Sequence, residues 1–486
     1  MKNIDKITTC IVLLIYQINT DTTTGNDISY LCLKKWRNTM KKKGTKIMKR
    51  VSAVSLAAVM AAMSLTGCGK GEDNGITWLA SSNAEQLKAY QNLMSEFSTD
   101  TGIEGSVVGV DNGQMYAKMQ SLIAANQTPE INTWGTEFVP WASRGAMTPL
   151  DEYIEKDNFD TSIFNESMYK ALSYDGKQWE FPCSTGVCVM FYNVDLFEEA
   201  GIDPPTHDWN DTSWTTDAFI ELAQKMTLDK EGRNALDPEF DADNIVQYGV
   251  GSMQSWAFWP WYFGGDWTDP EVTEYTGDSK EAIEGVQFVQ DLIQKYHVMP
   301  SDEQTQAMAA GGNVFTTGRV AMTIDGAWSC TTMNEADFKW DIAATPIGSK
   351  HSIVLFVDGF GIGGKTQNAD GGWEFIKWLY SDKDNYMEFL DAFTNYMTVP
   401  AVKSAEDDVK SILSERFPEV DMDVLFDAAN HPDATPVYFR YHKNYNEINE
   451  TLYQEAISPI MSGDKTAEEA MIDVKDKITE LINSEE

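Results

Sequence analysis

The stretch FTTGRVAMTIDGAW, from Phe315 to Trp328, is the most informative part of the sequence for the fold. Four other short segments precede it along the chain: LIAANQTPEI from Leu122, GAMTPLDEYI from Gly145, FYNVDLFEEAGI from Phe191 and SWTTDAF from Ser213. Each segment alone carries little weight. Their order and spacing along one chain make a specific pattern.

Predicted strands and helices alternate around these segments. The apolar run at 76–80 predicts a buried strand, and 102–110 predicts a second one. Between them, helical spacing from Asn83 onward places on one face Leu87, Tyr90, Leu93, Met94 and Phe97. Further helices are expected over 115–125, 214–226, 280–296, 373–380, 445–460 and 467–482. The alternation predicts an α/β architecture with largely parallel sheets, and 486 residues are enough for two compact lobes.

The chain contains an export signal near its beginning. Met48-Lys49-Arg50 is a basic segment, and the apolar run 51–65 follows it at once. This order predicts a secretory signal peptide over 48–67. Residues 1–47 are expected to be a mis-called N-terminal extension, because a genuine extension would have to be threaded ahead of a complete signal.

The signal ends in the sequence Leu65-Thr66-Gly67-Cys68, which resembles a bacterial lipobox. In such a motif the cysteine thiol is acylated and the cysteine becomes the new N-terminus. Cys68 is therefore expected to carry the lipid, with 68–75 as the lipidated cysteine and its tether. The lipid would be the protein's attachment to the membrane.

The net charge of the chain excludes two classes of binding partner. The formal net charge of −38 argues against nucleic acid and against an anionic membrane surface as partners.

Three cysteines follow the predicted tether, and they are Cys183, Cys188 and Cys330. Cys183 and Cys188 lie five residues apart, so on a strand they face opposite sides and could not easily bridge. Buried free thiols are expected.

Aromatic residues are concentrated in SWAFWPWYFGGDW, from Ser255 to Trp267, where four tryptophans, one tyrosine and two phenylalanines occupy thirteen residues. A membrane span needs about 20 apolar residues, and this run is shorter and interrupted by Pro260 and Gly264. The run itself leaves two interpretations open, a piece of the core or a binding surface.

The five ordered segments resemble those of the extracellular solute-binding proteins of carbohydrate ABC transporters, the maltose-binding-protein-like group, over nearly all of 76–486. The resemblance implies an α/β, two-lobed periplasmic-binding-protein-like fold, with a hinge crossed by the chain and a ligand cleft between the lobes. By comparison with the family, lobe 1 is 76–183 plus 358–412, and lobe 2 is 184–357 plus 413–486.

The resemblance also implies which residues face the ligand. A tryptophan face covers the C–H face of a sugar ring, and carboxylates and amides bind its hydroxyl rim. The implied cleft residues are Trp256, Trp259, Trp261, Trp328, Asp325, Trp134, Glu137, Ser81, Ser82, Asn83, Tyr438, Arg440 and Tyr441. Strand-like alternation in the aromatic run would send Phe258 and Phe263 into the core. Gly186 stands where maltose binders carry a carboxylate, so the ligand is not expected to be maltose.

The resulting functional interpretation is a lipid-anchored binding protein on the outer face of the bacterial cytoplasmic membrane. It would capture a sugar or oligosaccharide and deliver it to the permease of an ABC importer whose ATPase is a separate chain. We expect a monomer with no cofactor, no enzymatic activity and no nucleic-acid partner. Two alternatives stay open. One is a binder of polyamine or another cation, for which aromatics and acids also serve. The other is a secreted glycoside hydrolase, which needs two carboxyl groups roughly 5–9.5 Å apart.

Two further patterns are rejected as sites. GFGIGGKT, from Gly359 to Thr366, satisfies the phosphate-loop pattern, but no helix is expected to start at the Lys-Thr pair. The five histidines, His207, His297, His351, His431 and His442, show no metal-ligand spacing along the sequence, so no metal site is predicted.

Overall fold

The computed structural model describes residues 75–133, 138–253, 255–310, 312–437 and 442–484. The predicted extension, the signal peptide and Cys68 lie outside these ranges. Within them, every helix is too short or too polar to cross a membrane.

The described chain begins with three parallel strands. Strand β1 (Ile76–Ser81) lies between β2 (Gly105–Val110) and β3 (Ile131–Thr133). Helices α4 (Ala84–Thr101) and α5 (Asn112–Ala124) connect them. The predicted apolar face of α4 is confirmed for its four buried members, which are Tyr90, Leu93, Met94 and Phe97. This part of the chain therefore follows the predicted alternation.

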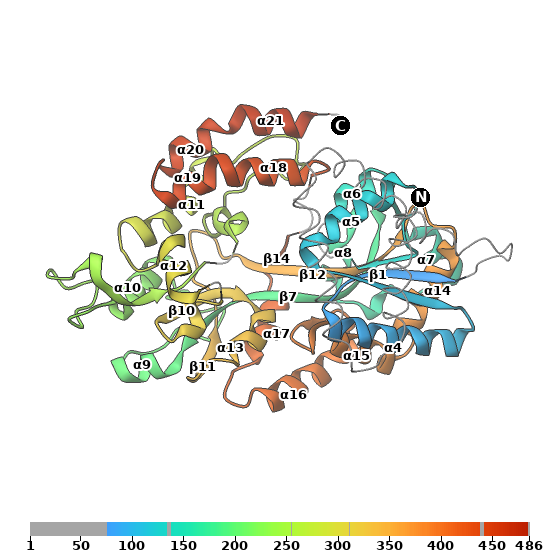
Figure 1. Cartoon of the computed structure of the whole chain (residues 1–486), viewed down its shortest axis with the longest axis horizontal. Helices are drawn as coiled ribbons and strands as arrows, with labels where there is room; N and C mark the ends of the chain where they lie inside the picture. Colours follow the sequence, from blue (N-terminus) through green and yellow to red (C-terminus); the bar gives the residue numbers. More distant parts are fainter. Residues whose placement is uncertain (1–74, 134–137, 254, 311, 438–441, 485–486) are drawn as a thin grey trace, which may run out of the picture. The chain divides into compact units, whose positions relative to one another are not determined.

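Two long antiparallel strands join the halves of the sheet. Strand β7 (Glu180–Asn193) pairs with β12 (Ile353–Gly363) through Glu180–Val187, and Figure 1 shows the two side by side. From Cys188 onward β7 pairs instead with β10 (Val320–Gly326) and β11 (Trp340–Ala343). The strand order is β2-β1-β3-β12-β7-β10-β9-β8, in which β9 is Ile245–Val250 and β8 is Leu228–Asp229. All fourteen residues of β7 are buried.

The remaining helices and short strands come before, between and after these two long strands in the chain. Before β7 the chain forms α6 (Val139–Ser143), β4 (Met147–Thr148), α7 (Asp151–Asp157), α8 (Glu166–Ala171), β5 (Ser173–Tyr174) and β6 (Lys177–Gln178). Between β7 and β12 it forms α9 (Val194–Ala200), α10 (Thr216–Met226), β8 (Leu228–Asp229), β9 (Ile245–Val250), α11 (Lys280–Gln294), α12 (Asp302–Ala309) and α13 (Cys330–Met333). After β12 come α14 (Ala369–Ser381), α15 (Lys383–Thr394), β13 (Val399–Pro400), α16 (Glu406–Arg416), α17 (Asp423–Ala429), β14 (Ala434–Pro436), α18 (Tyr445–Leu452), α19 (Ser458–Ser462), α20 (Ala467–Asp473) and α21 (Lys475–Asn483).

The expectation of largely parallel sheets is wrong for the middle of the structure. Strand β7 runs antiparallel to β12, β10 and β11, because β7 and β12 traverse the sheet in opposite directions. The long helix expected at 467–482 is also two helices, which meet at Val474. The expected buried thiols are confirmed, since Cys183, Cys188 and Cys330 are buried and form no disulfide.

The glycine-rich segment does not have the geometry of a phosphate loop. Gly359–Gly363 belongs to β12, and α14 begins only at Ala369, after Asn368 has capped it. The Thr366 hydroxyl bonds to the Glu130 carboxylate, and the Lys365 amide donates to Thr128 Oγ1 at 2.7 Å. A strand running directly into a helix at the Lys-Thr pair is therefore not present in this segment.

Candidate functional site

The aromatic run is a 3-10 helix over Trp256–Phe263, so the predicted strand-like alternation is wrong. The Ser255 side chain caps the start of the helix, and Gly264 ends it with a φ of 80°, a conformation that glycine adopts without a steric penalty. Side chains three residues apart share a face in such a helix. The two faces therefore differ from those that alternation predicts.

One face of this helix packs into the main core. Trp259 is 5% exposed and Tyr262 is 4% exposed, and both belong to the main hydrophobic cluster. Trp256, at the same spacing, is partly buried against that cluster. The other face carries Phe258 and Trp261, whose ring centroids lie 5.2 Å apart in a separate small cluster. Phe258 is buried, as expected, whereas Phe263 is only partly buried.

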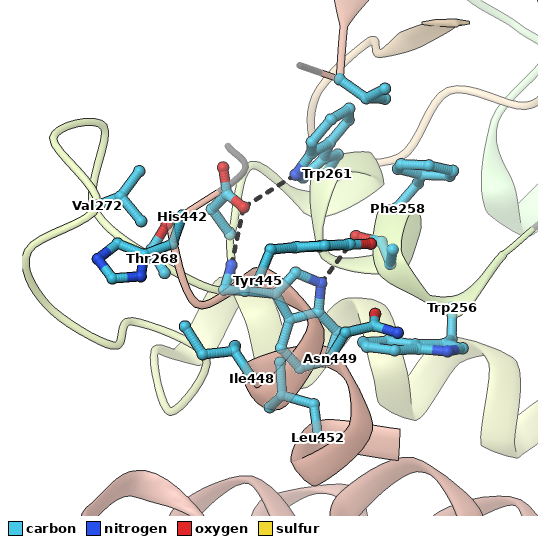
Figure 2. A pocket seen from close by; sticks show the side chains of 14 residues that line it. Trp256, Phe258, Trp261, Thr268, Val272, His442, Tyr445, Ile448, Asn449 and Leu452 are labelled. Carbon is cyan, nitrogen blue, oxygen red and sulfur yellow. Dashed lines mark hydrogen bonds between the residues drawn. The ribbon is translucent and has the colours of Figure 1, made fainter. Parts of the chain in front are cut away.

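Trp256, the second face and the end of the run line a pocket with helix α18. Figure 2 shows Trp256, Phe258 and Trp261 across from Tyr445 and Asn449. The full lining is Trp256, Ala257, Phe258, Trp261, Asp266, Trp267, Thr268, Val272, Val437, His442, Tyr445, Ile448, Asn449 and Leu452. The lining is mostly apolar with a few polar groups, which is the usual composition of a small-molecule site.

Hydrogen bonds fix two of the pocket's tryptophans. Trp261 Nε1 donates to Asp266 Oδ1 at 3.0 Å, and Trp267 Nε1 donates to the Ala257 carbonyl at 2.7 Å. The Trp256 ring meets the Trp267 ring edge-on, with centroids 5.1 Å apart. These contacts hold the indole rings in fixed orientations, so a ligand would find them already positioned.

Trp328 presents a flat aromatic surface to solvent. It follows Asp325 and Gly326 at the end of β10, and it is 44% exposed. Its indole lies across two glycines: a Cβ atom at Gly186 would lie 2.8 Å from the ring, and one at Gly326 would lie 2.2 Å from it. The absence of side chains at both positions lets the ring rest on the backbone.

A row of aromatic rings connects Trp328 with the pocket. The Phe356 ring meets Trp328 edge-on at 5.2 Å between centroids, and it meets Phe258 edge-on at the same distance. Phe258 in turn contacts Trp261. We call Trp328, Phe356, Phe258 and Trp261 the aromatic row. It joins residues from three separate parts of the chain, because Phe258 and Trp261 belong to the same 3-10 helix.

Asp325 places a carboxylate beside this row. Its Oδ1 accepts the Gly326 amide at 2.7 Å, and its Oδ2 accepts the Ser329 hydroxyl at 2.8 Å. Burial raises the pKa of Asp325 above its ordinary value, although both hydrogen bonds act in the opposite direction. Each carboxylate oxygen has two lone pairs, so the group is oriented and still able to accept a ligand hydroxyl.

The other expected cleft residues that the structure describes do not line this pocket. Trp259 lies in the core and does not line the pocket. Ser81, Ser82 and Asn83 lie at the carboxyl end of β1, where the Asn83 side chain caps α4. Five expected residues lie outside the described ranges, and they are Trp134, Glu137, Tyr438, Arg440 and Tyr441.

Five residues of the site are not predicted as binding residues from the sequence. Phe356 gave no signal, because it is one apolar residue in a long apolar strand. Gly186 was noticed only for lacking a carboxylate, whereas in the structure it is the surface on which Trp328 rests. Trp267, Tyr445 and Asn449 of the pocket were not singled out either.

Gly186→Ala is expected to weaken ligand binding while leaving most of the stability intact. The new methyl group would lie within 3 Å of the Trp328 ring, closer than carbon atoms approach without a shift, so the indole must turn away. Titration of ligand against Gly186→Ala and Gly113→Ala measures the effect. A Cβ atom at Gly113 would lie 3.4 Å from Asp111 Oδ1 and meet no aromatic ring. Equal affinity in both variants would contradict this role of Gly186.

Comparison with known proteins gives one family match. The family described as "Bacterial extracellular solute-binding protein" matches residues 80–386. Among curated proteins, a maltotriose-binding protein from Pyrococcus abyssi (strain GE5 / Orsay) is 23% identical over 331 residues. The match covers 65% of this chain and 64% of that protein, so the chain spans a little under two thirds of this relative's length.

Solved structures show the fold. An ABC substrate-binding protein from Listeria monocytogenes, in complex with cycloalternan, superposes with a TM-score of 0.68 at 24% identity, covering 84% of this chain and 98% of that one. The GacH receptor of Streptomyces glaucescens, solved unliganded and with acarbose, gives a TM-score of 0.65 at 18% identity, covering 85% and 99%. The chain therefore has the two-lobed α/β fold of periplasmic-binding-protein type.

Proposed function

Because the chain belongs to the family of bacterial extracellular solute-binding proteins, we propose that it captures a sugar or oligosaccharide outside the cytoplasmic membrane and delivers it to the permease of an ABC importer. The observation that carries this proposal is the exposed face of Trp328, seated on Gly186 and Gly326 beside Asp325. A rigid indole face matches the C–H face of a pyranose ring, and a carboxylate accepts the neighbouring hydroxyls.

The aromatic row also bears on the size of the ligand. It leads from Trp328 through Phe356 and Phe258 to the pocket beside α18. Phe258 and Trp261 are buried, whereas Trp328 is exposed and Trp256 is partly exposed at the pocket, and two accessible aromatic side chains suit more than one sugar ring. The ligands named with the similar proteins, maltotriose, cycloalternan and acarbose, are carbohydrates and support the same ligand class.

The proposed mechanism is closure of two lobes on the ligand, without covalent chemistry. We assign 76–183 plus 358–412 to lobe 1 and 184–357 plus 413–486 to lobe 2. The change of partner along β7, from β12 to β10 after Val187, supports a crossing in this strand. Trp328, Asp325 and the aromatic run then belong to lobe 2. Ser81, Ser82, Asn83, Trp134 and Glu137 would approach the ligand from lobe 1.

We further propose that Cys68 is lipidated and tethers the protein, which acts as a monomer, to the outer face of the membrane. Cys68→Ala should release the mature protein into the soluble fraction or leave it unprocessed, because the acyl chains would be its attachment. Fractionation and the apparent mass of the product measure this. Processing and membrane retention equal to those of the unmodified protein would contradict the anchor.

A thermal screen distinguishes the ligand classes. The purified protein is heated with monosaccharides, oligosaccharides and polyamines in parallel, and the sugars are analysed afterwards for cleavage. A ligand at 100 times its dissociation constant adds about 2.7 kcal/mol to the free energy of unfolding, which is readily measured. We expect a saccharide to raise the melting temperature and to be recovered intact. Stabilisation by polyamines alone would overturn the sugar assignment, and cleaved sugar would indicate a hydrolase.

A further inference from the structure

Two histidines and a carboxylate meet where two parallel strands begin, and none of the three lines the aromatic pocket. His351 lies just before β12, and His431 and Asp433 lie just before β14. The pairing of Ile353 with Ala434 brings these two loops together. One nitrogen from each imidazole and one carboxylate oxygen all lie within 4.8 Å of one another.

The separations are close to those that a metal ion imposes. His351 Nδ1 lies 3.1 Å from Asp433 Oδ2, and His431 Nδ1 lies 3.7 Å from the same oxygen. Ligands about 2.0–2.2 Å from a tetrahedral zinc ion lie about 3.3–3.6 Å from each other. The separations of 3.1 Å and 3.7 Å lie on either side of this range, so small side-chain rotations would bring three ligands onto one ion.

Neighbouring groups already hold one imidazole in the form that a metal requires. His431 Nδ1 accepts the Asp433 amide at 3.1 Å, so this nitrogen carries a lone pair and not a proton. Nε2 then bears the proton and donates to Asn210 Oδ1 at 3.3 Å. A metal-bound histidine usually has such an oxygen acceptor on its other nitrogen, which fixes the tautomer and the ring orientation. A bound ion would replace the Asp433 amide as the partner of the lone pair on His431 Nδ1.

The second imidazole is held by packing on one side and by its contact with Asp433 on the other. The His351 ring stacks on Trp209, with 25° between the ring planes. Its Nε2 is buried and has no hydrogen-bond partner within the described part of the chain. Asp433, by contrast, keeps 49% of its side chain exposed, which leaves a route for an ion and its waters.

We propose that His351, His431 and Asp433 bind one divalent transition-metal ion of the zinc class, with water completing its coordination. Two imidazoles and one carboxylate suit zinc and its neighbours rather than calcium or magnesium, which prefer oxygen ligands alone. The ion would join the loop before β12 to the loop before β14, and so clamp the C-terminal part of the chain to a central strand. This inference does not depend on the sugar-binding proposal.

This cluster could not be predicted from the sequence, because His351 and His431 are separated by eighty positions. No short ligand motif contains both residues, and only the β12–β14 pairing places them together. The prediction that the five histidines form no metal site rested on linear spacing alone.

The test uses the full protein without an affinity tag, titrated with zinc chloride by calorimetry and monitored by its melting temperature. We expect one zinc ion per chain and a rise in melting temperature that a chelator reverses. His431→Asn and Asp433→Asn should each weaken zinc binding at least about tenfold, and Asn210→Ala should weaken it about tenfold by releasing the His431 ring. His297→Asn, which removes an exposed histidine whose φ of 55° asparagine tolerates, should bind zinc as the unmodified protein does.

Cobalt gives a second readout that does not depend on the stability of the variants. Cobalt bound through two imidazoles and a carboxylate should produce visible absorption in the unmodified protein and in His297→Asn. The proposal is overturned if millimolar zinc leaves the melting temperature of the unmodified protein unchanged. It is equally overturned if folded His431→Asn and Asp433→Asn retain the affinity and the cobalt spectrum of the unmodified protein.

Discussion

Trp328→Ala is expected to weaken sugar binding about thirtyfold or more, with only a small loss of stability. Truncating an aromatic residue at the centre of a binding site commonly costs 2 kcal/mol or more of binding free energy, which corresponds to that factor. The fold depends less on this side chain, because 44% of it is exposed and its inner face rests on glycine backbone. The variant should therefore lose affinity for sugar while its free energy of unfolding changes little.

The measurement pairs a sugar titration with a denaturation curve for the same variant. Tyr174→Ala is a matched control, since Tyr174 is 38% exposed and lies in the short strand β5, outside the aromatic row. It should leave sugar affinity unchanged. If Trp328→Ala bound sugar as tightly as Tyr174→Ala does, Trp328 would not be the stacking surface.

Trp259→Ala should produce the opposite pattern. Trp259 is 5% exposed in the main core, and truncation of a buried tryptophan to alanine costs about 3–5 kcal/mol of the free energy of unfolding. Its carbonyl also lies against Gly285 of α11, so the helix and the aromatic run pack at close range there. The folded fraction of the variant should still bind sugar, because Trp259 does not line the pocket.

Urea denaturation gives the stability of Trp259→Ala, and titration at low temperature, where the variant is folded, gives its affinity. If the variant were as stable as the unmodified protein and failed to bind sugar, Trp259 would have to contact the ligand. That result would also show that the faces of the 3-10 helix are assigned wrongly. The two variants together distinguish a loss of sugar affinity, expected for Trp328→Ala, from a loss of stability, expected for Trp259→Ala.

Much of the fold could be predicted from the sequence, because local patterns determine it. The apolar spacing of Tyr90, Leu93, Met94 and Phe97 predicts α4, and α10 lies within the expected range 214–226. The ordered segments indicate the family, which the match over 80–386 confirms. These inferences use neighbouring residues or their order along the chain, and neither requires knowledge of long-range contacts.

The site was harder to predict, because its geometry arises from contacts between distant segments. Pro260 and Gly264 were noted as interruptions of the aromatic run, yet they belong to a 3-10 helix whose period of three decides which rings face the core. The position of Trp328 depends on Gly186, more than a hundred residues away. Phe356 acquires its role only because β12 pairs with β7. A single sequence contains no local signal for any of these contacts.

The most direct test of the central claim is a calorimetric titration of the purified protein with the oligosaccharide that stabilises it most, followed by recovery and analysis of that sugar. The account predicts saturable binding of one sugar per chain, release of the sugar unchanged, and a loss of affinity in Trp328→Ala. Absence of binding to any saccharide, or recovery of a cleaved product, would contradict it.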